Sequence, residues 1–149
     1  MNVIRALFAA LGFACLSAAA ADGLVMLKST MPAKATLDRF ELLAKERGLI
    51  VFARIDHAAG AAKVGKTLRP TELLIFGNPQ GGTPLMECAQ SAGIDLPLKA
   101  LAWEDAQGQS WLGYNDPAYL AKRHDAAACP VVDNLRKALA GLAEATLAK

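Results

Sequence analysis

LLIFGNPQGGTPLMECA, residues 73–89, joins an apolar run, a turn rich in glycine and the beginning of a helix. The apolar run predicts a buried β-strand over TELLIFGN (71–78). Thr83 and Pro84 suit the N-cap and first position of a helix that follows the glycines. Many phosphate-binding sites begin as strand, glycine loop and helix, so the stretch raises the question of whether its glycines hold an anion or serve the turn.

The glycines fit turn geometry better than they fit a nucleotide motif. A P-loop requires Gly-Lys-Ser/Thr at the start of its helix, whereas residues 81–84 read GGTP and contain no lysine. The spacing of the glycines also departs from the G-x-G-x-x-G dinucleotide pattern. Gly77-Asn78-Pro79 is typical of a turn, and paired glycines permit positive φ angles. Anion binding by free N–H groups at the helix start stays open as an alternative.

Strand and helix patterns alternate on both sides of this stretch. Strand patterns cover 23–29, 49–56, 71–78, 98–103 and 109–115, and helical patterns cover 37–46, 57–65, 83–93, 116–124 and 129–149. The nearly continuous apolar run LIVFARID (49–56) is typical of a strand covered on both faces. The order β-α-β-α-β-α-β-β-α-α predicts an α+β (α/β two-layer) domain with a mixed β-sheet, helices packed on the sheet and a closing hairpin.

The N-terminus has the pattern of a cleavable signal peptide. Arg5 supplies a positive charge, ALFAALGFACLSA is an apolar run, and AAAAD offers small residues for cleavage. The run is shorter than the roughly 20 residues of a membrane-spanning helix, which favours cleavage after Ala21, or after Ala19 or Ala20, over anchoring. We therefore expect a signal peptide at 1–21, one domain at 22–149, and a periplasmic or secreted protein without stable membrane insertion.

The charge of the chain is nearly balanced. Sixteen Lys and Arg stand against 14 Asp and Glu, and Arg5 leaves with the signal peptide. No basic stripe or block of like charge occurs, which argues against nucleic-acid binding and against electrostatic attachment to a membrane.

Two cysteines, Cys88 and Cys129, remain after cleavage, and both are disulfide candidates because exported proteins commonly form disulfides. The alternative is two buried free thiols that pack as small apolar side chains. Cys129 also precedes Pro130 at an expected helix start, where a thiol can become reactive.

Four segments resemble the domain-of-unknown-function family 302. They are ARIDHAAGAAKVG (53–65), LLIFGNPQGGTPLM (73–86), DLPLKALAWED (95–105) and GYNDPAYLAKRH (113–124). The family's pieces "IDH", "IFGNP", "LPLK" and "Y.DP..L..RH" occur in them in order, so the resemblance extends over nearly the whole mature chain. It implies a small α/β domain that tends to form homodimers in bacteria and archaea, and it implies no reaction.

Polar side chains follow two of the expected strands. His57 follows the second strand and Asn78 the third. If these strands are parallel, both side chains lie at one edge of the sheet, where α/β proteins commonly bind ligands. Asp116 or His124 could join them, so the ligand-binding candidates are His57, Asn78, Asp116 and His124. The competing interpretation is that His57 caps the next helix and His124 packs against its own helix end.

No complete catalytic signature can be recognised. The sequence shows no Ser-His-Asp or Cys-His arrangement and no ligand spacing such as C-x-x-C, so neither a metal site nor a cofactor is predicted. Our hypothesis is a non-catalytic homodimeric module that binds a small ligand or a partner protein at the His57/Asn78 edge. The alternatives are a hydrolase- or isomerase-like enzyme with His57 as acid–base, and a metal-binding or thiol-redox accessory protein that uses Cys88, Cys129 and histidine.

Overall fold

The computed structural model describes residues 21–148, so the expected signal peptide lies outside the described residues except for Ala21. The elements are β1 (Leu24–Ser29), α1 (Ala33–Glu46), β2 (Ile50–Asp56), α2 (His57–Lys63), β3 (Thr71–Gly77), α3 (Pro79–Cys88), the 3-10 helix η1 (Gln90–Ile94), β4 (Leu98–Glu104), β5 (Ser110–Asn115), α4 (Pro117–Arg123) and α5 (Val132–Leu147). The predicted order of strands and helices and the α+β class are confirmed. Among the described helices, none has both the length and the apolar content needed to cross a bilayer.

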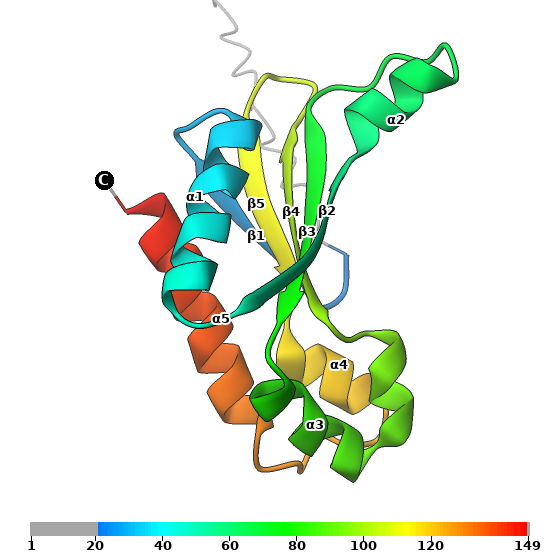
Figure 1. Cartoon of the computed structure of the whole chain (residues 1–149), viewed down its shortest axis with the longest axis vertical. Helices are drawn as coiled ribbons and strands as arrows, with labels where there is room; N and C mark the ends of the chain where they lie inside the picture. Colours follow the sequence, from blue (N-terminus) through cyan, green and yellow to red (C-terminus); the bar gives the residue numbers. More distant parts are fainter. Residues whose placement is uncertain (1–20, 149) are drawn as a thin grey trace, which may run out of the picture.

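The five strands form one antiparallel sheet in the order β1-β5-β4-β3-β2 (Figure 1). The expected mixed sheet is therefore wrong, and α2 explains why. A helix that connects parallel strands packs on the sheet through an apolar side, but α2 (HAAGAAK) has no buried residue and projects beyond the sheet. The chain returns through α2 as a hairpin that places Asp56 opposite Glu72.

β2 lies at the edge of the sheet, which corrects the expectation that residues 49–56 are covered on both faces. Ile50 and Phe52 on this strand are 49% and 54% exposed. The continuous apolar run predicted burial on both faces, but a strand at the edge of the sheet is partly exposed.

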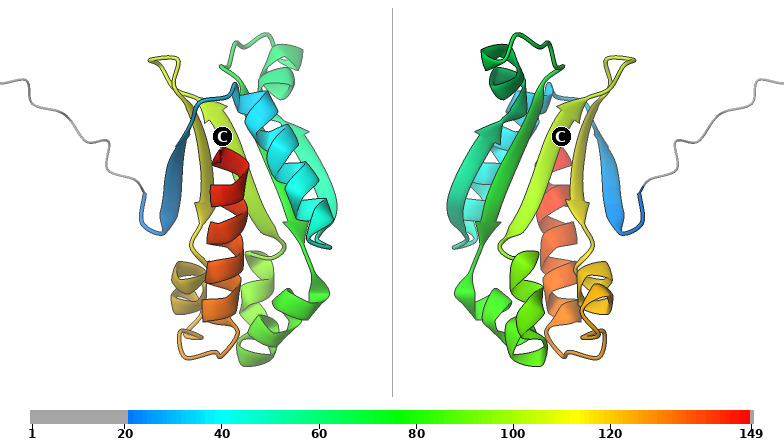
Figure 2. Two further views of the ribbon diagram at one scale, coloured as in Figure 1. Left: turned by 90° about the vertical axis from the view of Figure 1, so that its left-hand side faces the viewer. Right: turned by 90° about the vertical axis from the view of Figure 1, so that its right-hand side faces the viewer.

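The main core lies between the sheet and the pair α1 and α5, which cover the same face (Figure 2). In α1 the apolar side chains recur at helical spacing, so Leu37, Phe40 and Ala44 all point inward and are fully buried. The Phe40 ring meets the Phe76 ring of β3 edge to face, with centroids 5.1 Å apart. Leu142 of α5 completes this layer.

Arg54 connects β2 to α1 at the rim of this core. Its guanidinium lies 2.6 Å from Asp38 and 3.2 Å from Glu41, both on α1, and 2.7 Å from Glu72 of β3. Partial burial opposes ionisation of Asp38, but hydrogen bonds from Lys34 and Arg54 outweigh it, so the pKa of Asp38 lies below its usual value. The edge strand is thus held to α1 by ion pairs where apolar packing is thin.

A second cluster of buried residues lies below the sheet, where α3, η1, α4 and the start of α5 meet. It comprises Leu85, Ala92, Ala121, Ala126, Cys129 and Val132. A disulfide joins Cys88 at the end of α3 to Cys129 ahead of α5, with Cα atoms 6.0 Å apart. Of the two interpretations left open by the sequence, the structure therefore has the disulfide and not two free thiols.

The other face of the sheet is open. Figure 2 shows, on the right, that none of the described helices lies over the middle of this face. One row of neighbouring positions crosses all five strands and contains only apolar residues or glycine: Ile55, Leu73, Leu101, Gly113 and Met26. In the next row Trp103 stacks on Trp111, with ring centroids 6.3 Å apart. We call these residues the open face.

Candidate functional site

A cavity of about 430 Å³ lies between α3 and α5, beside the end of β3 and the start of β4. This volume is within the range of natural small-molecule sites, about 300–1,000 Å³. Apolar side chains form most of the wall, among them Phe52, Phe76, Met86, Leu96, Leu98 and Leu135. Such a lining releases water readily to an apolar ligand.

α3 begins before the two glycines and not after them, which corrects the predicted helix start. Asn78 is the N-cap and Pro79 the first helical residue, so residues 81–82 lie inside the helix. Thr83 and Pro84, the predicted cap and first position, follow within the same helix.

Gly81 allows α3 to pack closely against α5. A Cβ atom at Gly81 would lie 3.0 Å from Cδ2 of Leu135 on α5, which is tighter than an ordinary contact. A Cβ atom at Gly82 would lie 3.6 Å from Cδ1 of Leu96, an ordinary van der Waals distance. Gly81 therefore serves packing beside the cavity, and Gly82 has room for a methyl group.

The first N–H groups of α3 are already used within the chain. Gln80 N–H donates to Asn78 Oδ1 at 2.7 Å, and the N–H groups of Gly81 and Gly82 both donate to the Asn78 carbonyl oxygen at 3.0 Å. Pro79 has no N–H to offer. The helix start thus lacks the free donors that an anion site of the P-loop kind requires.

Polar groups reach the cavity at only a few points. Arg47, the residue after α1, is the one charged residue in the described lining, and it donates from Nη2 to the Gly141 carbonyl at 3.2 Å. Asn78 Oδ1 is occupied by the helix cap, which leaves the Asn78 amide N–H groups as donors. Thr83 adds a hydroxyl. The described lining contains no carboxylate, so the polar rim favours an anion or a neutral acceptor.

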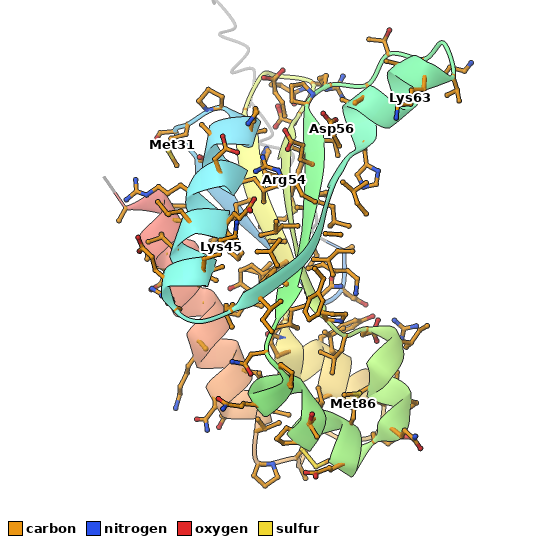
Figure 3. The ribbon with its side chains drawn as sticks, viewed as in Figure 1. Met31, Lys45, Arg54, Asp56, Lys63 and Met86 are labelled. Carbon is orange, nitrogen blue, oxygen red and sulfur yellow. A yellow bond between two sulfur atoms is a disulfide. The ribbon has the colours of Figure 1, made fainter. Side chains whose placement is uncertain are left out.

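His57 and Asn78 do not share a pocket. Because β2 and β3 are antiparallel, His57 lies near the start of β3 and Asn78 follows its end. Figure 3 shows this separation, with Asp56 at the α2 end of the molecule and Met86 of the cavity at the other. Asn78 lines the cavity, whereas His57 is exposed as the first residue of α2. The expectation of a common edge was wrong because it depended on parallel strands.

Asp116 has a structural task. Its Oδ1 accepts a hydrogen bond from Ala118 N–H at 2.8 Å, which makes it the predicted N-cap of α4. Asp56 has the same role at the start of α2, where its carboxylate accepts a hydrogen bond from Ala59 N–H at 2.8 Å. The competing interpretation, that His57 caps this helix, therefore holds for the residue before it, and His57 is the first helical residue.

His124 lies in a polar cluster that the sequence did not reveal. Its Nε2 is 2.7 Å from Asp95 Oδ2 and its Nδ1 is 3.0 Å from Ser91 Oγ. Arg123 Nη1 donates to the other Asp95 oxygen at 3.1 Å. Two segments that carry the family resemblance, DLPLK and RH, therefore meet through Asp95. Nothing in the spacing of residues 91, 95 and 124 signals this contact, which arises from the packing of η1 against α4.

The cysteines and histidines of the metal-binding alternative do not come together in the described residues. Within residues 21–148 there is no group of three or more His, Cys, Asp or Glu side chains arranged to hold a metal ion. Cys88 and Cys129 are bonded to each other, and Met86 lines the apolar cavity.

Three Brucella proteins are similar to this chain, each 53% identical over 103 residues. They are "Fluoride-specific ion channel FluC 1" of Brucella suis biovar 1 (strain 1330) and of Brucella abortus biovar 1 (strain 9-941), and "Fluoride-specific ion channel FluC 2" of Brucella melitensis biotype 1 (strain ATCC 23456 / CCUG 17765 / NCTC 10094 / 16M). The match covers 69% of this chain and 41%, 38% and 38% of those proteins. The chain thus spans about two fifths of the length of the curated relatives it matches.

The fold also matches a solved structure, "Crystal structure of uncharacterized conserved protein DUF302 from Bacillus stearothermophilus". The TM-score is 0.76 at 19% identity, over 86% of this chain and 100% of that one. At this identity the likeness shows a shared fold. Residues 25–142 match the family described as "Domain of unknown function DUF302". The resemblance seen in the sequence is confirmed, and the chain belongs to the DUF302 family.

Proposed function

We propose that the chain is a binding module that holds a small molecule with an apolar body and a negatively charged end in the cavity between α3 and α5. The observation that carries this proposal is the lining: almost wholly apolar walls, with Arg47 as their one charged residue among those described. Transfer of the apolar body from water into the cavity lowers the free energy, and the charged end stays near solvent at Arg47.

The name of the Brucella relatives supplies no ligand for this cavity. It describes longer proteins, of which this chain matches about two fifths. Fluoride is small and strongly hydrated, and burying it requires several hydrogen-bond donors in place of water. The apolar wall offers too few, so our proposal concerns an amphipathic organic anion.

We also propose that two copies pair through the open face. The apolar row across the sheet supports this, and so does α2, which packs on little of its own chain. Val64 and Leu68, just after α2, are apolar and are 73% and 46% exposed. In a two-fold dimer the same surface of each copy meets its equivalent on the other, so the apolar row of one copy would pack against the apolar row of the second.

Export completes the proposal. Residues 1–21 have the signal pattern, and a Cys88–Cys129 disulfide suits an oxidising compartment. N-terminal sequencing of the protein recovered from the periplasmic or secreted fraction tests this. We expect Asp22 as the first residue, and an intact Met1 would contradict export with cleavage.

Two dyes test the cavity. 1-Anilinonaphthalene-8-sulfonate has an apolar body and an anionic group, and N-phenyl-1-naphthylamine has the same body without the charge. We expect both to bind the oxidised protein with saturable fluorescence, about one molecule per chain.

Ala138→Phe places an aromatic ring at the cavity wall from an exposed position of α5, and should abolish the binding of both dyes. Lys137→Phe adds the same ring at a neighbouring exposed position outside the described lining, and should leave binding unchanged. Equal binding by the wild type and the Ala138→Phe variant would contradict the proposal.

A further inference from the structure

Ser91, His124 and Asp95 form a continuous chain of hydrogen bonds outside the cavity lining. The Asp95 carboxylate fixes the direction of its own bond to His124, and the direction of the Ser91 bond follows for the neutral imidazole. An ionised Asp95 carboxylate can only accept, so Nε2 of His124 carries a proton. In the neutral imidazole Nδ1 then has a lone pair, and Ser91 donates its hydroxyl proton to it over 3.0 Å. A hydroxyl that donates to an imidazole oriented by a carboxylate is the arrangement of an activated nucleophile.

The three side chains differ in burial as the parts of an activated nucleophile do. The His124 and Asp95 side chains are 9% and 16% exposed, whereas Ser91 is exposed. The base and its carboxylate are therefore shielded from water, and the hydroxyl is open to a reagent. Arg123 donates to the second carboxylate oxygen of Asp95, so the carboxylate is held between Arg123 and His124. Lys99 Nζ donates to the backbone carbonyl of Asp95 at 3.0 Å and so holds the main chain at this residue.

We propose that Ser91 is a nucleophile activated by His124, and that this cluster transfers the acyl group of small esters to water. The proposal concerns a second site and adds a reaction to the binding function.

The reaction consumes only the ester and water. Ser91 Oγ attacks the ester carbonyl carbon while its proton passes to His124 Nδ1, and the carbonyl electron pair moves to oxygen. The pair returns as the bond to the alcohol oxygen breaks, and the leaving alcohol takes the proton from Nδ1. Water then attacks the acyl-serine by the same route, which releases the carboxylic acid and restores Ser91.

The competing explanation is a latch that only ties η1 to α4. A latch requires the same hydrogen bonds but gives Ser91 no reactivity beyond that of any exposed hydroxyl. The exposed hydroxyls of Thr30 and Thr67, outside this cluster, serve as internal references for that ordinary reactivity.

The test is covalent labelling of the full chain by an alkyl fluorophosphonate, followed by intact-mass measurement and peptide mapping. We expect one adduct, on Ser91, and none in the Ser91→Ala variant. Wild-type protein that gains no more label than Ser91→Ala, or label only at other residues, would overturn the proposal.

A second comparison separates activation from mere exposure. His124→Gln should lower the labelling rate of Ser91 by about 100-fold or more, the usual scale of general-base catalysis. If this variant does not melt cooperatively, Asp95→Asn takes its place, because the amide keeps the shape of the carboxylate and removes its charge. Labelling at the wild-type rate in a folded His124→Gln or Asp95→Asn variant would show that the cluster is only a latch.

Discussion

The indole of Trp103 covers Gly113 on the open face: a Cβ atom at residue 113 would lie 2.8 Å from Cζ3 of that ring. Gly113→Ala therefore has to displace Trp103 from its stack with Trp111. We expect the free energy of unfolding to fall by about 1–3 kcal/mol, the usual effect of overpacking, measured by urea denaturation. Gly60→Ala in α2 is the control, because a Cβ there meets nothing within 4 Å, and it should stabilise by up to about 1 kcal/mol. An unchanged midpoint for Gly113→Ala would contradict the packing.

Reduction of Cys88–Cys129 should destabilise the protein markedly. The bond closes a loop across a sequence separation of 41, for which chain entropy gives roughly 4 kcal/mol as an upper guide. We expect dithiothreitol to lower Tm by about 10 °C or more in differential scanning fluorimetry. The double variant Cys88→Ser/Cys129→Ser should melt like the reduced protein and ignore dithiothreitol. Two alkylated cysteines in unreduced protein would show that the bond does not form.

Arg47→Gln should weaken the anionic dye and spare the neutral one. The guanidinium is exposed, so its attraction for a sulfonate is worth up to about 1 kcal/mol, or roughly a fivefold change in affinity. Fluorescence titration with 1-anilinonaphthalene-8-sulfonate should show this loss, and N-phenyl-1-naphthylamine should bind as before. A parallel loss for both dyes would mean that Arg47 shapes the cavity and does not recognise charge.

Leu73→Glu/Leu101→Glu should convert the proposed dimer to a monomer. The two positions are neighbours in the apolar row, so two copies would bury four carboxylates in one interface. Light scattering at tens of micromolar should show half the wild-type mass. Leu42→Glu is the control, because Leu42 is exposed on α1, away from the open face. A wild-type protein that is already monomeric at high concentration would refute the dimer.

Asp105 should contribute to stability in a pH-dependent way. The Trp111 indole N–H donates to Asp105 Oδ2 at 2.7 Å, and this bond is the main cause of a pKa of Asp105 below its usual value. Backbone N–H groups of Gln109 and Gln107 act in the same direction. Since the pKa is lowered by folding, the stabilisation is present above the unfolded-state pKa, about 3.9, and is lost as the pH falls through the folded-state value.

The measurement is Tm against pH for the wild type and for Asp105→Asn. The variant should be less stable at neutral pH, and the two curves should converge below about pH 4, where the unfolded-state carboxyl protonates. A gap between wild type and Asp105→Asn that stays constant down to pH 2 would contradict the assignment.

Local patterns predicted the elements well, because apolar spacing and helix-start residues act over a few positions. Leu37 and Phe40 recur at helical spacing, and Asp116 with Pro117 marks the start of α4. The prediction of parallel strands was wrong for a physical reason. The relative direction of two strands depends on whether the segment between them can pack an apolar surface on the sheet. The alanines of residues 57–63 give α2 little to bury, and that decides the hairpin between β2 and β3.

The candidate site was predicted in part. Asn78 lines the cavity, but the same strand reversal that makes the sheet antiparallel removes His57 from it. The Ser91–His124–Asp95 contact joins positions 29 and 33 residues apart, and only tertiary packing brings them together. Cys88 and Cys129 are the two cysteines left once Cys15 is removed with the signal peptide, so the sequence made a disulfide one of two interpretations. Only the fold brings their Cα atoms within 6.0 Å of each other.

β1 pairs with β5 alone, and its first residue, Leu24, lies opposite Asn115. The place for this strand therefore does not exist until residues 110–115 have been synthesised. During synthesis β1 therefore stays unpaired after it leaves the ribosome. Its pairing with β5 then closes a loop of about 90 residues, and such contacts form slowly because closing a long loop costs entropy. Completion of the sheet is thus a late event in folding, and a chain interrupted anywhere before β5 lacks the one strand that pairs with β1.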